Sequence, residues 1–410
     1  MESLALSGLR VADFTWAWAG PYATMLFADM GAEIINIETY PQSSNLRMNP
    51  PHPKGKREGV NSGGWWSSSQ RGKLSCTIDL KNPKGVELAK RIVGICDLVA
   101  ENFSPGVMDR LGLGYSVLKE IKSDIIYIAM SGYGTTGPES NRISYGTQVA
   151  MSAGLIRTTG FPDAPPSSIL IPYSDPVAGL NGALALLAAL HYRSRTGLGQ
   201  YIDLSQTEAA ACFVPEALMD YTMNGKVRTR RGNRDDFMAP HGCYPCRGEE
   251  NWVTIAVSTE TEWEALCRVM GNPDWTREER FADELSRWKN QDELDKFMGT
   301  WTKKHAHYEV MKMLQDAGVA AVPTLNGAEL PRDPHLKERS FFVEDGRPEM
   351  GKKKMAGPSW KMNKTPGKAR RPAPSLGEHN QYVFSELLGL SEDDITQLES
   401  DKVIAIVQPS

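Results

Sequence analysis

The sequence predicts an α/β protein with a doubly wound parallel sheet, followed by a smaller α+β domain. Three observations lead to this prediction. Short β-prone runs alternate with helix-forming segments from residue 9 to about residue 204, as in parallel sheets. The loops after these runs are rich in glycine, proline and aromatic residues, as loops that bind ligands beyond the strand ends would be. After about residue 225, a hairpin-like pair of strands and amphipathic helices replaces this alternation.

The first elements form a compact strand-helix-strand unit. We expect a strand over residues 9–14, a helix over 22–30 that Gly31 ends, and a second strand over 33–38. Such a unit needs parallel pairing and a right-handed crossover. Residues 40–73 are rich in proline, serine, glycine and asparagine, which predicts a loop. The remaining elements expected in the sheet domain are strands over 77–80, 98–101, 124–130 and 201–204, and a helix over 82–96 that Asn82-Pro83 opens.

The change in pattern sets the domain boundaries. We expect the first part of a large domain over residues 1–225, a small α+β domain over 226–325, and a linker with a final helical segment over 326–410. The small domain combines a hairpin in HGCYPCRGEENWVTIAV with helices over 261–270, 291–305 and 308–317 and a strand over 319–324. Residues 345–375 are basic and rich in proline, which is typical of a solvated connector. The helical segment 382–398 is interrupted at Gly389.

One carboxylate stands at the start of a long apolar run. Asp175 and Pro176 precede residues 177–190, where Asn181 is the one polar residue. Asp followed by Pro is a helix start, because Asp caps free amides and Pro fits the first helical position. A helix that is apolar nearly all round is predicted to be buried. The positive helix end favours an ionised Asp175. Taken alone, this pattern indicates a helix cap, with a chemical role as the alternative.

Composition excludes several classes of partner. The 410 residues carry a net charge of −4, so a basic excess for nucleic acid or an anionic membrane is lacking. The N-terminal residues lack the features of a signal peptide, and the longest apolar run, 183–190, is too short to cross a bilayer. The six cysteines are scattered, which suits reduced thiols. We therefore expect a cytoplasmic protein that contacts neither nucleic acid nor membrane.

Other candidate motifs fail their context tests. The glycines from Gly132 to Gly137 fit the dinucleotide fingerprint, but Pro138 and polar residues follow where an apolar helix should begin, so we expect no NAD. Cys243 and Cys246 form half a metal or redox site without a second half, and the dispersed histidines do not complete it, so we expect no metal. A serine-hydrolase elbow is missing as well. A carboxylate that acts as nucleophile or acid/base remains.

Several blocks in order resemble the class III coenzyme A transferases, the CaiB/BaiF family, over nearly the whole length. The blocks are LSGLRVADFT with AGPYATMLFADMGAEIINIE, QRGKLSCTIDLKNPKG, AENFSPGVMDRLGLGY, SGYGTTGP, DPVAGLNGALALLAAL with RSRTGLGQYIDLSQTEAA, DPHLKERSFF, and LGEHNQYVFSELLGLS.

The resemblance implies a nucleophile and a reaction. In the family, the Asp of D-x-x-A-G, here Asp175, attacks an acyl-CoA thioester to give a mixed anhydride and CoA thiolate. The thiolate then forms an aspartyl-CoA thioester, and an acceptor acid takes the CoA. Acyl-CoA and carboxylic acids are thus the substrates, without metal or NAD. The implied fold is a Rossmann-like large domain, to which residues 326–410 return, and a smaller domain. Two chains interlock like rings, as a homodimer or with a homologous subunit.

The resemblance also implies a CoA-binding set. By motif position, CoA lies near Ala17, Arg71, Lys73, Asn102, Phe103, Arg110 and Tyr145. CoA phosphates favour Arg, Lys and helix N-termini, which fits the cations in this set. Without the resemblance, Arg110 would be a solvated helix residue and Phe103 a core residue.

At two positions this sequence differs from related enzymes of the superfamily, and the differences favour particular reactions and substrates. Tyr145 stands where related racemases have a His, and Tyr is poorly suited to shuttle a proton at neutral pH, which favours transfer. Trp18 stands where formyl-CoA transferases have a Gln, with Trp16 beside it. As site residues, the two tryptophans favour an aryl or larger apolar acyl group; the alternative is core packing.

The block APHGCYPCRGEENW resembles the branch that handles aromatic dicarboxylates, with succinyl-CoA as donor and benzylsuccinate as acceptor. Two alternatives remain, a racemase-like isomerase of 2-methylacyl-CoA and a non-catalytic homologous subunit of a hetero-oligomeric transferase. The intact Asp175 motif argues against the non-catalytic subunit.

Overall fold

The computed structural model describes residues 4–39, 45–55, 59–168, 171–347 and 350–405. The contacts divide the chain into two compact units, one of residues 1–156, 168–226 and 335–410 and the other of residues 157–167 and 227–334. The sequence pattern changes near residues 225 and 325, close to two of these borders. The short segment 157–167 belongs to the smaller unit, although the sequence analysis placed it within the large domain.

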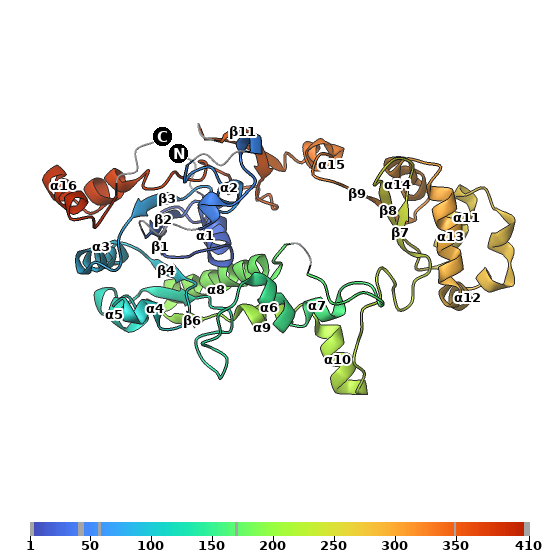
Figure 1. Cartoon of the computed structure of the whole chain (residues 1–410), viewed down its shortest axis with the longest axis horizontal. Helices are drawn as coiled ribbons and strands as arrows, with labels where there is room; N and C mark the ends of the chain where they lie inside the picture. The colour runs from blue at the N-terminus through green and yellow to red at the C-terminus, as the bar shows by residue number, and fades with distance from the viewer. Residues whose placement is uncertain (1–3, 40–44, 56–58, 169–170, 348–349, 406–410) are drawn as a thin grey trace. The chain divides into compact units, whose positions relative to one another are not determined.

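The larger unit contains a six-stranded sheet in the order β3-β2-β1-β4-β5-β6 (Figure 1). All five strand pairs are parallel, and Val11 of β1 pairs with both Ile34 of β2 and Leu98 of β4. The chain direction across the sheet therefore reverses between β1 and β4, and ligands of doubly wound sheets bind beyond the carboxyl ends of strands at such a point. The strands are β1 (Arg10–Asp13), β2 (Glu33–Glu38), β3 (Leu74–Thr77), β4 (Leu98–Glu101), β5 (Ile126–Ala129) and β6 (Tyr201–Asp203).

Helices cover both faces of this sheet, because alternate strand residues point to opposite sides. Val11 joins the core formed with α1 (Ala19–Asp29) and α8 (Ser174–Thr196), whereas Ala12 joins the core formed with α3 (Pro83–Gly94) and α5 (Tyr115–Ile121). The structure thus confirms the predicted α/β class. The other helices of this unit are α2 (Gly64–Ser69), α4 (Val107–Arg110), α6 (Gly146–Ser152), α9 (Gln206–Ala211), α10 (Pro215–Asn224) and α16 (Glu392–Ser400). By residue number, α7 (Leu155–Thr158) is divided between the two units, and all of α15 (Pro334–Glu338) except Pro334 belongs to this one.

Helix α8 differs from its prediction in two ways. It begins at Ser174 after Tyr173, so Asp175 lies in the first turn and is not the cap. Pro176 fits there because amides of the first turn need no helical partner. The helix is also not buried all round, since Leu180, Leu184 and Leu187 expose 49%, 67% and 44% of their surface. Within the described chain, nothing covers this apolar side.

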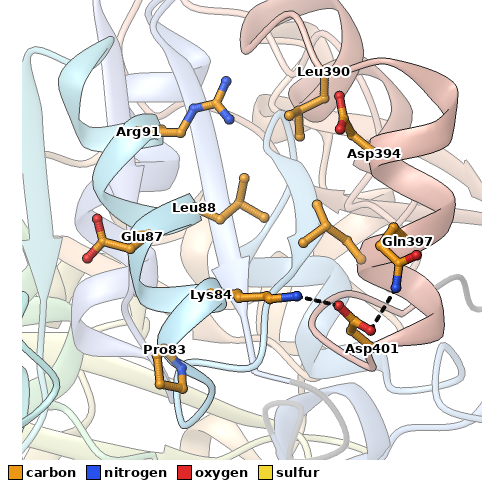
Figure 2. Close-up of a pocket in the computed structure, with 10 residues that line it drawn as sticks. Pro83, Lys84, Glu87, Leu88, Arg91, Leu390, Asp394, Gln397 and Asp401 are labelled. Carbon is orange, nitrogen blue, oxygen red and sulfur yellow. Dashed lines mark hydrogen bonds and ion pairs between the residues drawn. The ribbon is translucent and has the colours of Figure 1, made fainter.

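The C-terminal segment packs on the face of the sheet that carries α3. Val383 and Phe384 of the π-helix Tyr382–Leu387 and Ile395 of α16 belong to the same core as α3. Figure 2 shows Lys84 of α3 facing Asp401, which follows α16, at 2.6 Å between Nζ and Oδ2. A cavity of about 460 Å³ lies between these two helices. It is on the opposite face of the sheet from α1 and α8.

The basic segment expected to be a solvated connector contains a hairpin. β10 (Phe342–Arg347) pairs antiparallel with β11 (Gly351–Ala356), so the connector prediction is wrong for these residues. The predicted loop over residues 40–73 lies partly outside the described residues. Its described parts contain α2 and short helices over Asn45–Met48 and Pro53–Gly55. None of the helices in the described ranges is both long and apolar enough to cross a membrane.

The smaller unit has a three-stranded antiparallel sheet in the order β7-β8-β9, packed on amphipathic helices around one core. The hairpin predicted from HGCYPCRGEENWVTIAV is confirmed as β7 (His241–Pro245) and β8 (Trp252–Ala256), with β9 (Ala320–Thr324) as the third strand. The helices are α11 (Glu260–Val269), α12 (Glu284–Lys289), α13 (Gln291–Thr302) and α14 (His307–Asp316).

Candidate active site

The loops after β1 and β4 are joined by a side-chain amide at the point where the strand order reverses. The backbone N–H of Trp16 donates to Oδ1 of Asn102, and Nδ2 of Asn102 donates to the carbonyl of Trp16, both at 2.7 Å. The ring of Phe103 meets Trp16 edge-on, with centroids 5.9 Å apart. Three residues predicted for substrate or CoA thus lie together at the carboxyl edge of the sheet.

The same loop carries Ala17 and Trp18. Ala17 is exposed and has a φ of +54°, a left-handed conformation that residues with a side chain rarely adopt and that functional sites often contain. Trp18 packs against Trp65 and Tyr22, with ring centroids 5.4 and 6.4 Å away. Both tryptophans are half-buried, so each combines packing with an accessible edge.

Asp175 lies where the first turns of α6 and α8 meet. Oγ of Ser174 donates to the carbonyl of Gly146 at 2.6 Å and ties the two helix starts together. A Cβ on Gly146 would lie 2.7 Å from each carboxylate oxygen of Asp175, so only glycine leaves room for this carboxylate. Tyr145, which immediately precedes Gly146, is 72% exposed. The predicted nucleophile and Tyr145 are therefore neighbours.

Helices α1 and α8 pack side by side, which brings Asp175 to the loop after β1. A Cβ on Gly179, one turn beyond Asp175, would lie 2.8 Å from the carbonyl oxygen of Ala19 and 2.9 Å from the ring of Tyr22. Crossover helices begin at the carboxyl edge of a parallel sheet, so both helices start on the side of the Trp16 loop. Asp175 and the aromatic loop thus lie at the same edge of the sheet.

The Asp175 carboxylate is buried without a polar partner. Asp175 is 8% exposed, and its carboxylate accepts no hydrogen bond from any residue that the structure describes. Burial raises the pKa of Asp175 from 3.8 to about 7. This effect opposes the helix end, which favours the ionised form. A carboxylate that is desolvated yet ionises near neutral pH is suited to attack an electrophilic carbonyl.

Arg71 and Lys73 are held inside the fold by buried acids. Arg71 makes a two-pronged ion pair with Asp29 at the end of α1, at 2.9 and 2.6 Å, and Nζ of Lys73 lies 2.9 Å from Asp13 at the end of β1. Asp29 ends α1, so Arg71 lies at the opposite end of that helix from Trp18. Among the described residues, the acids paired with Arg71 and Lys73 are Asp29 and Asp13, and neither cation is paired with Asp175.

Arg110 is exposed at the end of α4, which follows the Phe103 loop. Its guanidinium stays close to this loop, since Nη1 would lie 3.1 Å from a Cβ on Gly106. Arg110 therefore offers a cation at the carboxyl edge of the sheet, where a phosphate could bind.

The sequence analysis did not single out two buried residues of this region, Gly146 and Glu101. Gly146 follows Tyr145, but its closeness to Asp175 depends on tertiary packing. Glu101 ends β4, and its Oε2 accepts the N–H of Phe103 at 2.7 Å. Burial raises the pKa of Glu101 to about 7. Its position at the carboxyl end of a parallel strand could have marked it.

The structure also describes the motifs that the sequence excluded as an NAD site and a metal site. Asp203, the last residue of β6, holds the glycine-rich loop by accepting both the N–H and the hydroxyl of Thr135, at 2.8 and 2.6 Å. Cys243 and Cys246 are free thiols on or next to β7 in the smaller unit. The described residues contain no group of three or more His, Cys, Asp or Glu arranged to hold a metal ion.

The family model described as CoA-transferase family III matches residues 6–380. The chain belongs to CoA-transferase family III. It is a CoA transferase with acyl-CoA as a substrate.

Two relatives and one solved structure illustrate this membership. The chain is similar to a succinyl-CoA–D-citramalate CoA-transferase of Chloroflexus aurantiacus, at 34% identity over 97% of this chain and 98% of the relative. It is also similar to the beta subunit of a succinyl-CoA–L-malate CoA-transferase of that organism, at 29% identity over 98% of each chain. Among solved structures, it matches a CaiB/BaiF family protein from Brucella suis with a TM-score of 0.86 and 29% identity, covering 94% of this chain and all of that one.

Proposed function

We propose that this family III transferase moves CoA from succinyl-CoA to a dicarboxylic acid that carries an apolar, aromatic substituent, with benzylsuccinate as the first candidate. The observation that carries the reaction is the partnerless, buried carboxylate of Asp175 beside the aromatic loop of Trp16 and Trp18. The names of the two relatives described above support succinyl-CoA as donor. We place the reaction in the cytoplasm.

In the proposed mechanism, an oxygen of Asp175 attacks the thioester carbonyl of the donor, the C–S bond breaks, and CoA leaves as thiolate. The thiolate attacks the Asp175 carbonyl of the mixed anhydride and releases the donor carboxylate. The acceptor carboxylate then attacks the aspartyl-CoA thioester, and the returning thiolate takes the acyl group from the second anhydride. Each step exchanges one thiolate for one carboxylate, so no net proton or electron is consumed.

We assign CoA to the carboxyl edge of the sheet. In this proposal, Ala17, Asn102 and Phe103 border its pantetheine arm, Tyr145 covers the reacting carbonyl, and Arg110 contacts a phosphate. Arg71 and Lys73 act as positioning residues, since their side chains are engaged by Asp29 and Asp13. In this proposal, the two hydrogen bonds between Asn102 and Trp16 hold the loop in the conformation that binds CoA.

The Trp16–Trp18 loop supports an acceptor with an aromatic substituent, because aromatic side chains favour edge or offset contacts with a ring. A second candidate is a small hydroxy dicarboxylate, which the relatives named for D-citramalate and L-malate favour. The experiment is to incubate succinyl-CoA with benzylsuccinate, D-citramalate or L-malate and to identify new CoA esters by liquid chromatography and mass spectrometry. The proposal predicts the highest kcat/KM for benzylsuccinate.

Replacing Trp18 tests this preference within one enzyme. We expect Trp18→Gln to lower kcat/KM for benzylsuccinate by roughly tenfold, a loss of about 1.4 kcal/mol of contact, and to change the citramalate value little. An equal loss for both acids would assign Trp18 to packing. The absence of any CoA ester from dicarboxylates, together with α-proton exchange in 2-methylacyl-CoA, would replace transfer by isomerisation.

We propose further that two chains interlock through the uncovered side of α8, as a homodimer or with a homologous subunit. Leu180, Leu184 and Leu187 form one exposed apolar stripe, and Leu218 and Met223 of α10 are also exposed, at 62% and 71%. Apolar side chains that gather on an exposed face are typical of an interface. Light scattering after size exclusion should give a dimer, and Leu184→Glu should weaken it. A stable, active monomer would contradict this assembly.

A further inference from the structure

A second cavity of the larger unit lies at the far end of α1 from Asp175. It has a volume of about 460 Å³ and is formed by α15, the start of β10 and the segment that follows β11. The N–H of Lys368 donates to the carbonyl of Asp29 at 2.9 Å, which fixes this segment to the last residue of α1. Helix α1 has 11 residues and is therefore roughly 16 Å long, so the cavity is separate from the active site.

Two aromatic residues, Trp360 and Phe341, line the cavity. Nε1 of Trp360 lies 3.2 Å from Sδ of Met30, and Trp360 packs against the core shared by α1 and α8. A Cβ on Gly367 would lie 3.4 Å from Nε1 of Trp360, and one on Gly357 would lie 2.7 Å from the carbonyl oxygen of Phe341. Gly367 thus lets the chain pass close to the ring of Trp360, and Gly357 lets it pass close to the backbone of Phe341.

The charge in the cavity has one sign. Arg339, Lys361 and Lys368 all line it, and none of the described lining residues is acidic. In the described part of the chain, neither Arg339 nor Lys361 forms an ion pair, although 50 acidic residues are present in the sequence. All three residues are exposed, and cations gathered around a cavity without a counter-charge favour an anionic ligand.

We propose that this cavity binds a small organic anion with a flat aromatic body, the chemistry shared by aryl phosphates and mononucleotides. Trp360 and Phe341 contact the ring, and Arg339 and Lys361 contact the anionic group. The volume lies within the range of small-molecule sites, which combine an apolar wall with few polar groups. This inference is independent of the proposed function, because no cavity residue belongs to the Asp175 site.

The test is fluorine NMR of the full chain labelled with 5-fluorotryptophan. The sequence has ten tryptophans, and the signal of Trp360 is assigned through its loss in Trp360→Phe. The probes are phenyl phosphate and AMP, titrated separately. We expect a saturable shift of the Trp360 signal with at least one of them. A shift with both probes supports binding of aromatic phosphates in general. A shift with only one probe supports either aryl phosphates or mononucleotides as the ligand class.

Charge reversal then locates the anion. Lys361→Glu should weaken binding by roughly tenfold, which corresponds to about 1.4 kcal/mol. Lys364→Glu is the matched control, because this lysine lies three residues away and does not line the cavity. The proposal is overturned if neither probe shifts the Trp360 signal, if Lys361→Glu and Lys364→Glu bind alike, or if phenol or inorganic phosphate alone binds as tightly as phenyl phosphate.

Discussion

Two buried aspartates lie beside the starts of two neighbouring helices, and their surroundings are opposite. Asp13, before α1, accepts the N–H and hydroxyl of Thr15, the hydroxyl of Thr24 at 2.8 Å, and the ammonium of Lys73 at 2.9 Å. Asp175, in the first turn of α8, accepts no hydrogen bond from a described residue. Both aspartates are buried, with Asp13 0% exposed and Asp175 8% exposed.

We propose that this difference separates a structural acid from a reactive one. The four donors around Asp13 occupy its lone pairs and hold the loop that carries Trp16. Asp175 keeps its lone pairs free, and the lack of donors is unfavourable for the folded protein. Functional sites keep such unfavourable groups because the same property supports chemistry. The following predictions test this contrast.

The largest expected effect is the loss of transfer in Asp175→Asn. The amide cannot form the anhydride, so we expect kcat/KM for CoA transfer to fall by about 10⁴-fold or more, as for other lost nucleophiles. The far-ultraviolet circular dichroism spectrum should not change. Turnover within tenfold of the native rate would assign the nucleophile to another residue.

The next effect concerns stability at the other aspartate. Asp13→Asn leaves the buried ammonium of Lys73 without its counter-charge, so we expect a loss of about 3–5 kcal/mol in urea unfolding. The double variant Asp13→Asn/Lys73→Met should recover part of this loss, since it removes both charges. If the losses of stability measured for Asp13→Asn and for Lys73→Met alone simply add up in the double variant, Asp13 and Lys73 do not stabilise each other.

Stability should also depend on pH through Asp175. Its pKa is about 7 in the folded chain, against 3.8 for an aspartate in water, so ionisation disfavours folding. Below pH 3.8 both states are protonated and the residue has no effect. The penalty grows as pH rises toward 7 and then stays constant, at up to about 4 kcal/mol. Asp175→Asn should therefore be more stable than the native protein at about pH 8 and equally stable at about pH 3.5. An equal difference at both pH values would contradict the raised pKa.

The smallest expected effect comes from the glycine beside Asp175. A methyl group in Gly146→Ala would meet both carboxylate oxygens at 2.7 Å, so Asp175 must move. A displacement of this size should lower kcat by about 10²-fold while the protein stays folded. The matched control is Gly327→Ala, where a Cβ meets nothing within 4 Å. Native kcat in Gly146→Ala would show that the contact is dispensable.

Much of the sheet was predictable because local patterns determine it. The runs at 9–14, 33–38 and 98–101 became adjacent parallel strands, and Asn82 caps α3 by accepting the N–H of Lys84 at 3.0 Å. The hairpin β10–β11 was missed, because the lysines at 352–354 resemble a solvated run. The exposed side of α8 was also missed, since an apolar sequence does not reveal whether its cover comes from the same chain.

The roles of the predicted site residues stay predictions, and their geometry was only partly predictable. Motif position singled out Asp175, Trp16, Asn102 and Phe103, and the structure gives the contact between the last three. The engagement of Arg71 by Asp29 depends on an acid 42 residues earlier in the chain, which no local pattern indicates. The same is true of the space that Gly146 leaves for Asp175.

The central claim is that the free carboxylate of Asp175 becomes covalently attached to CoA. The most direct measurement is to incubate the protein with succinyl-CoA, quench it with acid, and analyse the Asp175 peptide by mass spectrometry. We predict the mass of CoA minus water on Asp175, converted by hydroxylamine to a hydroxamate, and no such adduct on Asp13. Transfer without any adduct, or an adduct on another residue, would contradict the account.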